Sequence, residues 1–136
     1  MSIHAEKPAV IEVTVGKALP LEIPNVIYLY KKVGGDMTHV SPANTYVARN
    51  ASSIVIGALS VFEAGDTSAV IRTVGVDPAF EGKGVGSQLL KKVIEELKKE
   101  GFRSISIAHQ NRNQKFYEKF GFKELNPSEM VLELMG

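Results

Sequence analysis

The most regular hydrophobic pattern in the chain lies between residues 85 and 101. Its apolar positions recur at helical spacing and form one stripe, while the positions between them are mainly lysine and glutamate. Gly101 follows the last apolar position, where glycine commonly ends a helix. The pattern therefore predicts an amphipathic helix that begins at Val85 and ends before Gly101. The apolar stripe consists of Val85, Leu89, Leu90, Val93, Ile94 and Leu97.

Stretches rich in β-branched residues, bounded by turn residues, predict strands on both sides of this helix. Residues 45–49, 54–63 and 68–76 follow one another with short polar turns between them, which predicts an antiparallel meander. Asp77-Pro78 ends the third strand, because proline cannot donate a hydrogen bond to a neighbouring strand. Further strands are predicted over residues 9–15, 102–108, 122–125 and 130–134.

Two segments complete the expected fold. Residues 111–120 predict a second helix, which Gly121 ends. Residues 16–44 are interrupted by prolines and glycines, and within them residues 23–32 fit either a short helix or a strand. The mixture of strands and helices predicts an α+β fold, with a single mixed, largely antiparallel sheet flanked by helices.

Length and composition suit one globular domain. The chain has 136 residues, of which 44% are hydrophobic and 23% charged, and these values are near the averages for soluble proteins. We therefore expect residues 1–136 to form a single domain. No apolar run reaches the ~18 residues of a membrane span, and the first residues lack the apolar stretch of a signal peptide. The expected location is cytoplasmic, with no membrane partner.

The residue inventory excludes several kinds of chemistry. The chain has 0 cysteines, which excludes a disulfide scaffold, a cysteine nucleophile and a thiolate metal site. His4, His39 and His109 lie far apart in the sequence, so we expect no metal site. A net charge of +1 does not indicate a nucleic-acid partner. Residues 81–124 nevertheless carry 10 basic and 6 acidic side chains, which fits either an anionic ligand or solvated helix faces.

A glycine-rich loop precedes the predicted helix. Glycine lets a backbone approach a ligand closely and adopt positive φ, and a helix N-terminus presents unpaired N–H groups and partial positive charge. This combination suits a pyrophosphate, to which Lys83 adds positive charge and Ser87 a hydroxyl. A glycine-rich turn before a helix is also often only a turn, and the spacing matches neither the Rossmann nor the P-loop pattern. The alternating glycines are Gly82, Gly84 and Gly86.

A second stretch, F-Y-E-K-F-G-F over residues 116–122, contains a candidate catalytic side chain. Phe116 and Phe120 stand four residues apart and are expected to pack in the core. Tyr117 lies beside them, and such a tyrosine is either a packed aromatic with a solvated hydroxyl or a proton donor. Alone, the stretch does not decide between the two.

Taken together, the two stretches resemble the GCN5-related N-acetyltransferase (GNAT) family. The shared features are a strand ending in V-x-V-D-P, the loop x-G-x-G-x-G, an amphipathic helix, a strand, and the aromatic stretch about 30 residues after the loop. The resemblance runs from about Thr45 to the C-terminus. The chain departs from the family pattern at Glu81, where the family has glutamine or arginine, and at Gln110 and Asn113, where it often has asparagine and alanine.

This resemblance implies an acetyl-CoA or other short acyl-CoA donor and an amine acceptor. With no cysteine, the amine would attack the thioester directly in a ternary complex. The Val76 N–H would stabilise the oxyanion, and Tyr117 would protonate the departing thiolate. The residues implied in acetyl-CoA binding are Val74, Val76, Gly82, Lys83, Gly84, Val85, Gly86, Ser87, Gln110, Asn113, Phe116 and Tyr117.

The base that deprotonates the amine stays open. An ordered water chain is one alternative to a side chain, and the candidate side chains are Glu63, Asp77, His39 and His109.

The sequence leaves three functions open. The first is an N-acetyltransferase acting on a primary amine of a small molecule or peptide. The second is a non-catalytic CoA-binding sensor or interaction module, and the third is an interaction protein of unrelated α+β fold. An apolar C-terminal segment, residues 130–132, and the short segment 16–44 also favour a homodimer.

Overall fold

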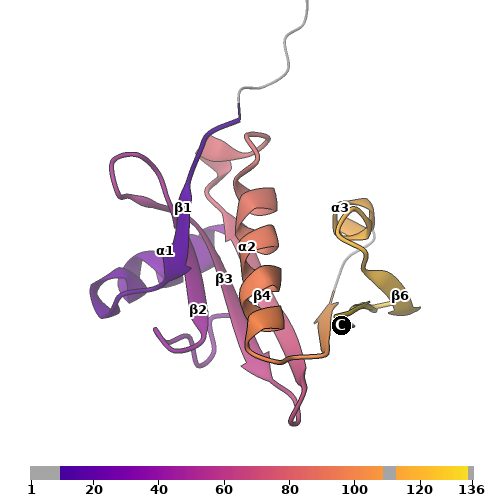
Figure 1. Ribbon diagram of the computed structural model, residues 1–136. Helices are drawn as coiled ribbons and strands as arrows, with labels where there is room; N and C mark the ends of the chain where they lie inside the picture. The colour runs from indigo at the N-terminus through magenta and orange to yellow at the C-terminus, as the bar shows by residue number, and fades with distance from the viewer. Residues whose placement is uncertain (1–9, 109–112, 135–136) are drawn as a thin grey trace, which may run out of the picture.

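The structure is a computed structural model that describes residues 10–108 and 113–134. Seven strands form one sheet in the order β1-β2-β3-β4-β5-β7-β6 (Figure 1). Neighbouring strands are antiparallel except β4 and β5, which are parallel, so the predicted mixed, largely antiparallel sheet is confirmed. The strands are β1 (Thr14–Lys17), β2 (Thr45–Arg49), β3 (Val55–Glu63), β4 (Ser68–Val76), β5 (Ser104–Ala108), β6 (Lys123–Asn126) and β7 (Glu129–Glu133).

Helix α2 (Val85–Lys99) is the predicted amphipathic helix, and its apolar stripe covers one face of the sheet. Five stripe residues are buried, and Ile94 is partly buried against the same cluster. Burying each large aliphatic side chain contributes roughly 1.5–3 kcal/mol, so this stripe anchors the helix. Gly101 follows with a left-handed φ of 95°. The five buried residues are Val85, Leu89, Leu90, Val93 and Leu97.

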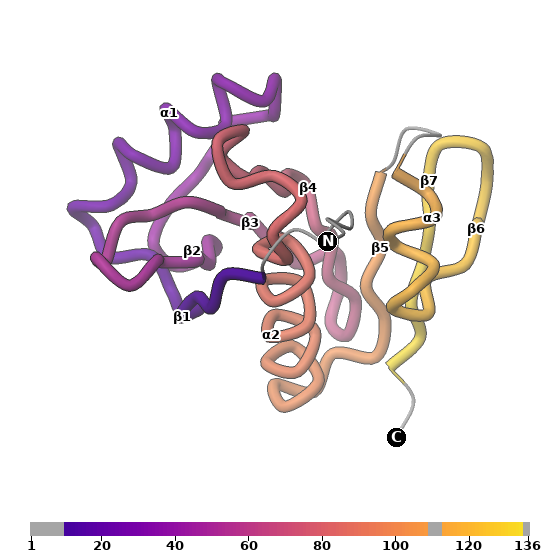
Figure 2. Tube along the Cα trace, turned by 90° about the horizontal axis from the view of Figure 1, so that it is seen from above, coloured from indigo at the N-terminus to yellow at the C-terminus, as the bar shows by residue number. Residues whose placement is uncertain are grey.

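Helix α1 (Ile23–Val33) resolves the segment that fitted either a helix or a strand. It packs on the face opposite α2, because its Val26 and Tyr30 meet Val47 and Ala58, whose strand neighbours point toward α2. Figure 2 shows the two helices on opposite sides of β2 and β3. None of the helices in residues 10–108 and 113–134 combines the length and apolar character needed to cross a membrane.

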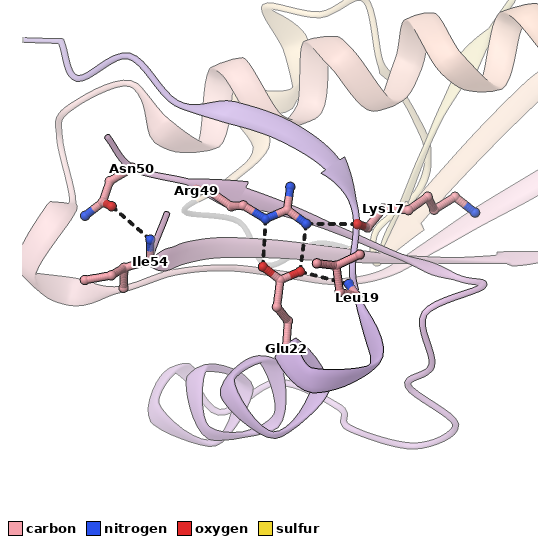
Figure 3. A network of polar contacts seen from close by, with 6 residues as sticks. All are labelled: Lys17, Leu19, Glu22, Arg49, Asn50 and Ile54. Atoms are coloured by element: carbon pink, nitrogen blue, oxygen red, sulfur yellow. Dashed lines mark hydrogen bonds and ion pairs between the residues drawn. The ribbon is translucent and has the colours of Figure 1, made fainter. Parts of the chain in front are cut away.

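A partly buried ion pair ties the start of α1 to the sheet (Figure 3). Arg49 Nε and Nη2 each donate to a Glu22 carboxylate oxygen at 2.7 Å. Glu22 also accepts from the Leu19 N–H at 2.8 Å, and Arg49 donates to the Lys17 carbonyl at 3.1 Å. Through these bonds, the short 3₁₀ helix η1 (Pro20–Glu22) is fixed to β1 and β2.

Two predicted elements differ from the structure by more than two residues at one end. The strand predicted over residues 9–15 is wrong in position: β1 begins at Thr14, because residues 10–13 bond to the start of α2 instead of to β2. The helix predicted over residues 111–120 is shorter among the described residues, where α3 runs over Gln114–Glu118. After it the chain turns, and the Phe120 and Phe122 N–H groups both donate to the Tyr117 carbonyl.

The apolar segment 130–132 lies within β7. Met130 is fully buried there, and Val131 and Leu132 are partly buried. The fold itself therefore covers the segment that suggested a homodimer, and the homodimer stays a prediction.

Strands β4 and β5 pair along only part of β4, and this shapes the site. Their register runs from Ser68 opposite Ser104 to Ile71 opposite Ile107, while β4 continues to Val76. Arg72 is an extra residue in β4, because Ile71 pairs with Val61 and Thr73 with Ser60 on β3. Such a bulge reverses the direction of the residues that follow it.

Candidate active site

A cavity of about 600 Å³ opens where β4 ends, between that strand, the start of α2, and α3. It brings together the two sequence stretches that lie about 30 residues apart along the chain. The residues that line it are Val74, Val76, Phe80, Glu81, Gly82, Gly84, Val85, Gly86, Ser87, Asn113, Phe116 and Tyr117.

The glycine loop presents backbone N–H groups to this cavity. Gly82 and Gly84 have left-handed φ values of 76° and 81°, which glycine adopts without strain. Gly84 caps α2, and Gln88 is the first residue whose N–H donates into the helix, at 3.1 Å to the Gly84 carbonyl. The N–H groups of the three residues before Gln88 thus have no acceptor within the helix. This wall can bind an anion such as a phosphate.

The free edge of β4 forms a second wall. The Asp77 N–H donates to the Ile56 carbonyl at 2.8 Å, which fixes the alternation of hydrogen-bonded pairs along β3 and β4. By that alternation the main-chain groups of Val74 and Val76 point away from β3. They point to the side where β5 no longer pairs, so they can bond an extended ligand as a strand would.

Tyr117 packs in the third wall with its ring buried and 6% of the residue exposed. Its ring contacts Phe116 edge-on at a centroid distance of 5.2 Å, and Phe122 at 5.9 Å. Burial raises the pKa of Tyr117, so the hydroxyl keeps its proton at neutral pH. The packed aromatic and the proton donor are therefore compatible in one side chain.

Ten of the twelve residues implied in acetyl-CoA binding line the cavity. Lys83 does not: its carbonyl accepts from the Ile11 N–H on the outer side of the loop. Gln110, like the base candidate His109, lies outside the described residues. Phe80 lines the cavity without having been predicted, and it lies at the end of the 3₁₀ helix η2 (Pro78–Phe80). Asp77-Pro78 was the available signal, since Asp77 caps this turn by accepting from the Ala79 N–H.

The other base candidates are not among the residues that line the cavity. Glu63 pairs with Ala69 at the far end of β3, whereas Val76 pairs with Gly57. Six residues of strand separate the two levels, or about 20 Å. His39 is exposed in the α1–β2 loop, and Asp77 forms an ion pair with Lys32 at 3.9 Å. The structure therefore does not bring Glu63, His39 or Asp77 to the cavity lining.

Solved structures share this fold. The protein Rv2747 from Mycobacterium tuberculosis, solved in complex with CoA, matches 90% of this chain and 99% of its own with a TM-score of 0.81 and 17% identity. The ribosomal-protein-S18-alanine N-acetyltransferase from Escherichia coli matches 92% of this chain and 96% of its own with a TM-score of 0.76 and 16% identity. At these identities the likeness shows the fold alone.

Curated relatives are similar over shorter stretches. The mycothiol acetyltransferase of Propionibacterium freudenreichii is 33% identical over 87 residues, which cover 60% of this chain and 28% of that protein. The N-alpha-acetyltransferase RimI of Mycobacterium tuberculosis is 33% identical over 58 residues, which cover 40% of this chain and 37% of that protein. The chain therefore matches well under half of the length of either relative.

A family profile covers more of the chain. The acetyltransferase (GNAT) domain matches residues 41–124, which include β4, the glycine loop and α3. The match spans more than half of the sequence and contains every described residue that lines the cavity. The chain belongs to the GNAT acetyltransferase family.

Proposed function

We propose that this protein is an N-acetyltransferase that moves the acetyl group of acetyl-CoA to a primary amine of a small molecule or peptide. One observation carries the proposal: a single cavity contains unpaired helix N–H groups, the free edge of β4 and a buried tyrosine. These are groups for a pyrophosphate, an extended pantetheine arm and a departing thiolate. The CoA complex of Rv2747 supports the same ligand.

The binding mode follows from the walls. The pyrophosphate would rest on the N–H groups that begin with Gly82 and end with Ser87. The pantetheine arm would lie along β4 and exchange main-chain hydrogen bonds with Val74 and Val76. The arm would pass Val76 first, because that end of β4 lies against the start of α2, and the thioester would lie farther along β4, toward Val74 and Tyr117. Glu81 lies at the phosphate end, where its negative charge opposes binding.

The proposed reaction is one direct transfer in a ternary complex. The amine nitrogen attacks the thioester carbon, and the carbonyl oxygen becomes an oxyanion that accepts a hydrogen bond from the Val74 N–H. This N–H points to the same free side of β4 as the Val76 N–H that the sequence suggested for the role. The carbon–sulfur bond then breaks, and the thiolate takes the Tyr117 hydroxyl proton. The proton lost by the amine leaves to solvent, and Tyr117 is reprotonated from solvent. A cysteine intermediate is unavailable, because the chain has no cysteine.

Solvent is the base that we favour. The amine must lose a proton before it has a lone pair for attack. Glu81 is the one ionisable carboxylate among the described residues that line the cavity, and it lies at the phosphate end. His109 lies outside the described residues and stays a candidate.

A CoA-binding module without turnover is the second candidate. Glu63, His39 and Asp77 are absent from the cavity lining, and this favours the module, since a domain without turnover needs no base. Calorimetric titration with CoA and thiol release from acetyl-CoA over a panel of primary amines separate the two. We expect CoA binding together with amine-dependent thiol release. Binding without release would support the module, and no binding would contradict both. The cytoplasmic location and the homodimer stay predictions. Light scattering tests the homodimer.

A further inference from the structure

A short segment ahead of β1 lies against the outer side of the glycine loop. We call residues 10–13 the strap. The Ile11 N–H donates to the Lys83 carbonyl at 3.0 Å. This hydrogen bond links the strap to a loop more than seventy residues later in the sequence. The bonded carbonyl belongs to the residue immediately before Gly84.

The Gln88 side chain supplies the other bonds to the strap. Its Nε2 donates to the Ile11 carbonyl at 2.6 Å, and its Oε1 accepts from the Val13 N–H at 3.2 Å. The same Nε2 donates to the Gly84 carbonyl at 3.2 Å. A side-chain amide offers two donors and an acceptor oxygen, and here they replace the peptide group of a neighbouring strand. The reversed amide would put donor against donor at Val13.

Gly84 is consequently held from outside while it lines the cavity from inside. A Cβ atom on Gly84 would lie 3.2 Å from Val10 Cγ1, so the valine side chain sits directly over this glycine. Val10 itself is 70% exposed, and it gains little from burial in the core. The strap therefore acts at two places: its start lies over the left-handed turn that begins α2, and its Val13 is partly buried against the main core cluster.

We propose that the strap and Gln88 are positioning elements that hold the glycine loop in the shape that receives the CoA pyrophosphate. The inference rests on the proposed function. Glycine loses more conformational freedom on ordering than any other residue. A loop that is already ordered binds its ligand more tightly, because less entropy is lost on binding. Gln88 would thus strengthen CoA binding without lining the cavity.

Coupling of this kind is reciprocal. We call the strap closed when it is hydrogen-bonded to Lys83 and Gln88. If the closed strap strengthens CoA binding by a given factor, bound CoA must stabilise the closed strap by the same factor. The Ile11 and Val13 N–H groups are bonded only when the strap is closed, so their hydrogen exchange reports its opening. If Gln88 only stabilised the fold, CoA binding would not change the hydrogen exchange of these two amides.

The first experiment uses Gln88→Met, which keeps side-chain length and helix propensity but removes the three bonds. Lys98→Met is the matched control, because Lys98 is exposed on the same helix near the end that lies far from the strap. We expect Gln88→Met to raise the CoA dissociation constant about tenfold, with kcat at saturating acetyl-CoA within about twofold. The control should leave both values within about twofold. An unchanged CoA dissociation constant in folded Gln88→Met would overturn the proposal.

The second experiment needs no variant and uses the intact protein with and without CoA. We expect saturating CoA to slow exchange at Ile11 and Val13 about tenfold, the factor expected from Gln88→Met. Unchanged exchange in a protein that binds CoA would overturn the strap and leave the proposed function intact. A protein that binds no CoA would overturn the proposed function as well, so the two failures are distinguishable.

Discussion

Gly86 and Phe116 are neighbours in the lining of the cavity, with room for one carbon atom between them. A Cβ atom on Gly86 would lie 3.6 Å from Phe116 Cζ and 3.6 Å from Val76 Cγ2. The fold thus has room for a methyl group at this position. The methyl group would, however, occupy space at the start of α2, where the CoA pyrophosphate is expected. A substitution at position 86 is therefore expected to weaken ligand binding while the protein stays folded.

We predict that Gly86→Val raises the KM for acetyl-CoA at least about tenfold, or about 1.4 kcal/mol. The branched side chain projects between α2 and α3, whereas the fold has room for its first carbon. Gly86→Ala serves as the graded control: it should weaken binding less and leave the free energy of unfolding equal or higher, since alanine favours a helix. Calorimetry and thermal melting measure both. Wild-type affinity for acetyl-CoA in a folded Gly86→Val protein would contradict the proposal that the glycine loop is part of the binding site.

A second prediction concerns the charge at the mouth of the loop. Glu81 is exposed and lines the cavity, so its repulsion of a phosphate is screened by water and salt. Glu81→Gln should lower the KM for acetyl-CoA about two- to fivefold at low ionic strength, and the gain should shrink as salt is added. Glu95→Gln, on an exposed position of α2, is the matched control. A salt-independent effect would argue against an electrostatic cause.

The sequence indicates most of the fold because its strongest patterns are local. The stripe of α2 and the three strands of the meander each depend on neighbours a few residues apart, and all were predicted within one or two residues. The cavity lining follows for the same reason, since the glycines and the F-Y pair are marked by local motifs, and the roles of these residues stay predictions. Glu63 could also have been excluded: it precedes the turn into β4, so an antiparallel hairpin places it opposite the start of that strand, far from Val76.

The strap was beyond prediction for the opposite reason. Residues 10–13 alternate like a strand, and nothing nearby shows that a glutamine 75 residues later accepts the Val13 N–H. The hydrogen bond between the Ile11 N–H and the Lys83 carbonyl was beyond prediction for a similar reason. A lysine in a glycine loop suggests a phosphate ligand, but here its carbonyl holds the strap. Contacts between distant segments, and the direction of a single backbone group, depend on tertiary packing. A short stretch of sequence does not reveal them.

The ion pair between Glu22 and Arg49 gives a prediction for stability against pH. The Arg49 hydrogen bond is the main cause that lowers the pKa of Glu22, and burial opposes it. A carboxyl whose folded pKa is lowered stabilises the fold above its unfolded pKa, and that contribution is lost as pH falls through the folded value. Side-chain exposures of 18% and 14% make the pair stronger than a surface pair.

We therefore expect Glu22→Gln to lower the free energy of unfolding by about 1–2 kcal/mol at pH 7. The difference from wild type should shrink as the pH falls below the unfolded pKa of about 4.3 and should be lost once the pH passes the lowered pKa of folded Glu22. Urea unfolding at several pH values measures it, with Glu95→Gln as the exposed control. A difference that stays constant down to pH 2 would show that the hydrogen-bond geometry, and not the charge, stabilises η1.

Tyr117 is where the packed aromatic and the proton donor differ most clearly. Its ring is fixed by Phe116 and Phe122, so Tyr117→Phe keeps the packing and removes only the hydroxyl. Thermal stability should change little, because the ring contacts remain. Burial raises the pKa of Tyr117, so the hydroxyl stays protonated above its usual value of about 10. Any alkaline loss of activity at lower pH must then come from another group.

If the hydroxyl protonates the departing thiolate, we expect Tyr117→Phe to lower kcat about ten- to hundredfold, the lower part of the range for general acid catalysis. The KM for acetyl-CoA should change little, because one lost hydrogen bond contributes only about 1 kcal/mol to binding. The defect should diminish with an acyl donor whose thiol is more acidic, since that thiolate leaves with less help. Steady-state kinetics with acetyl-CoA and such a donor test both expectations. Wild-type kcat in Tyr117→Phe would leave Tyr117 a packed aromatic and solvent the proton source, whereas an equal defect with both donors would assign the hydroxyl to positioning the thioester.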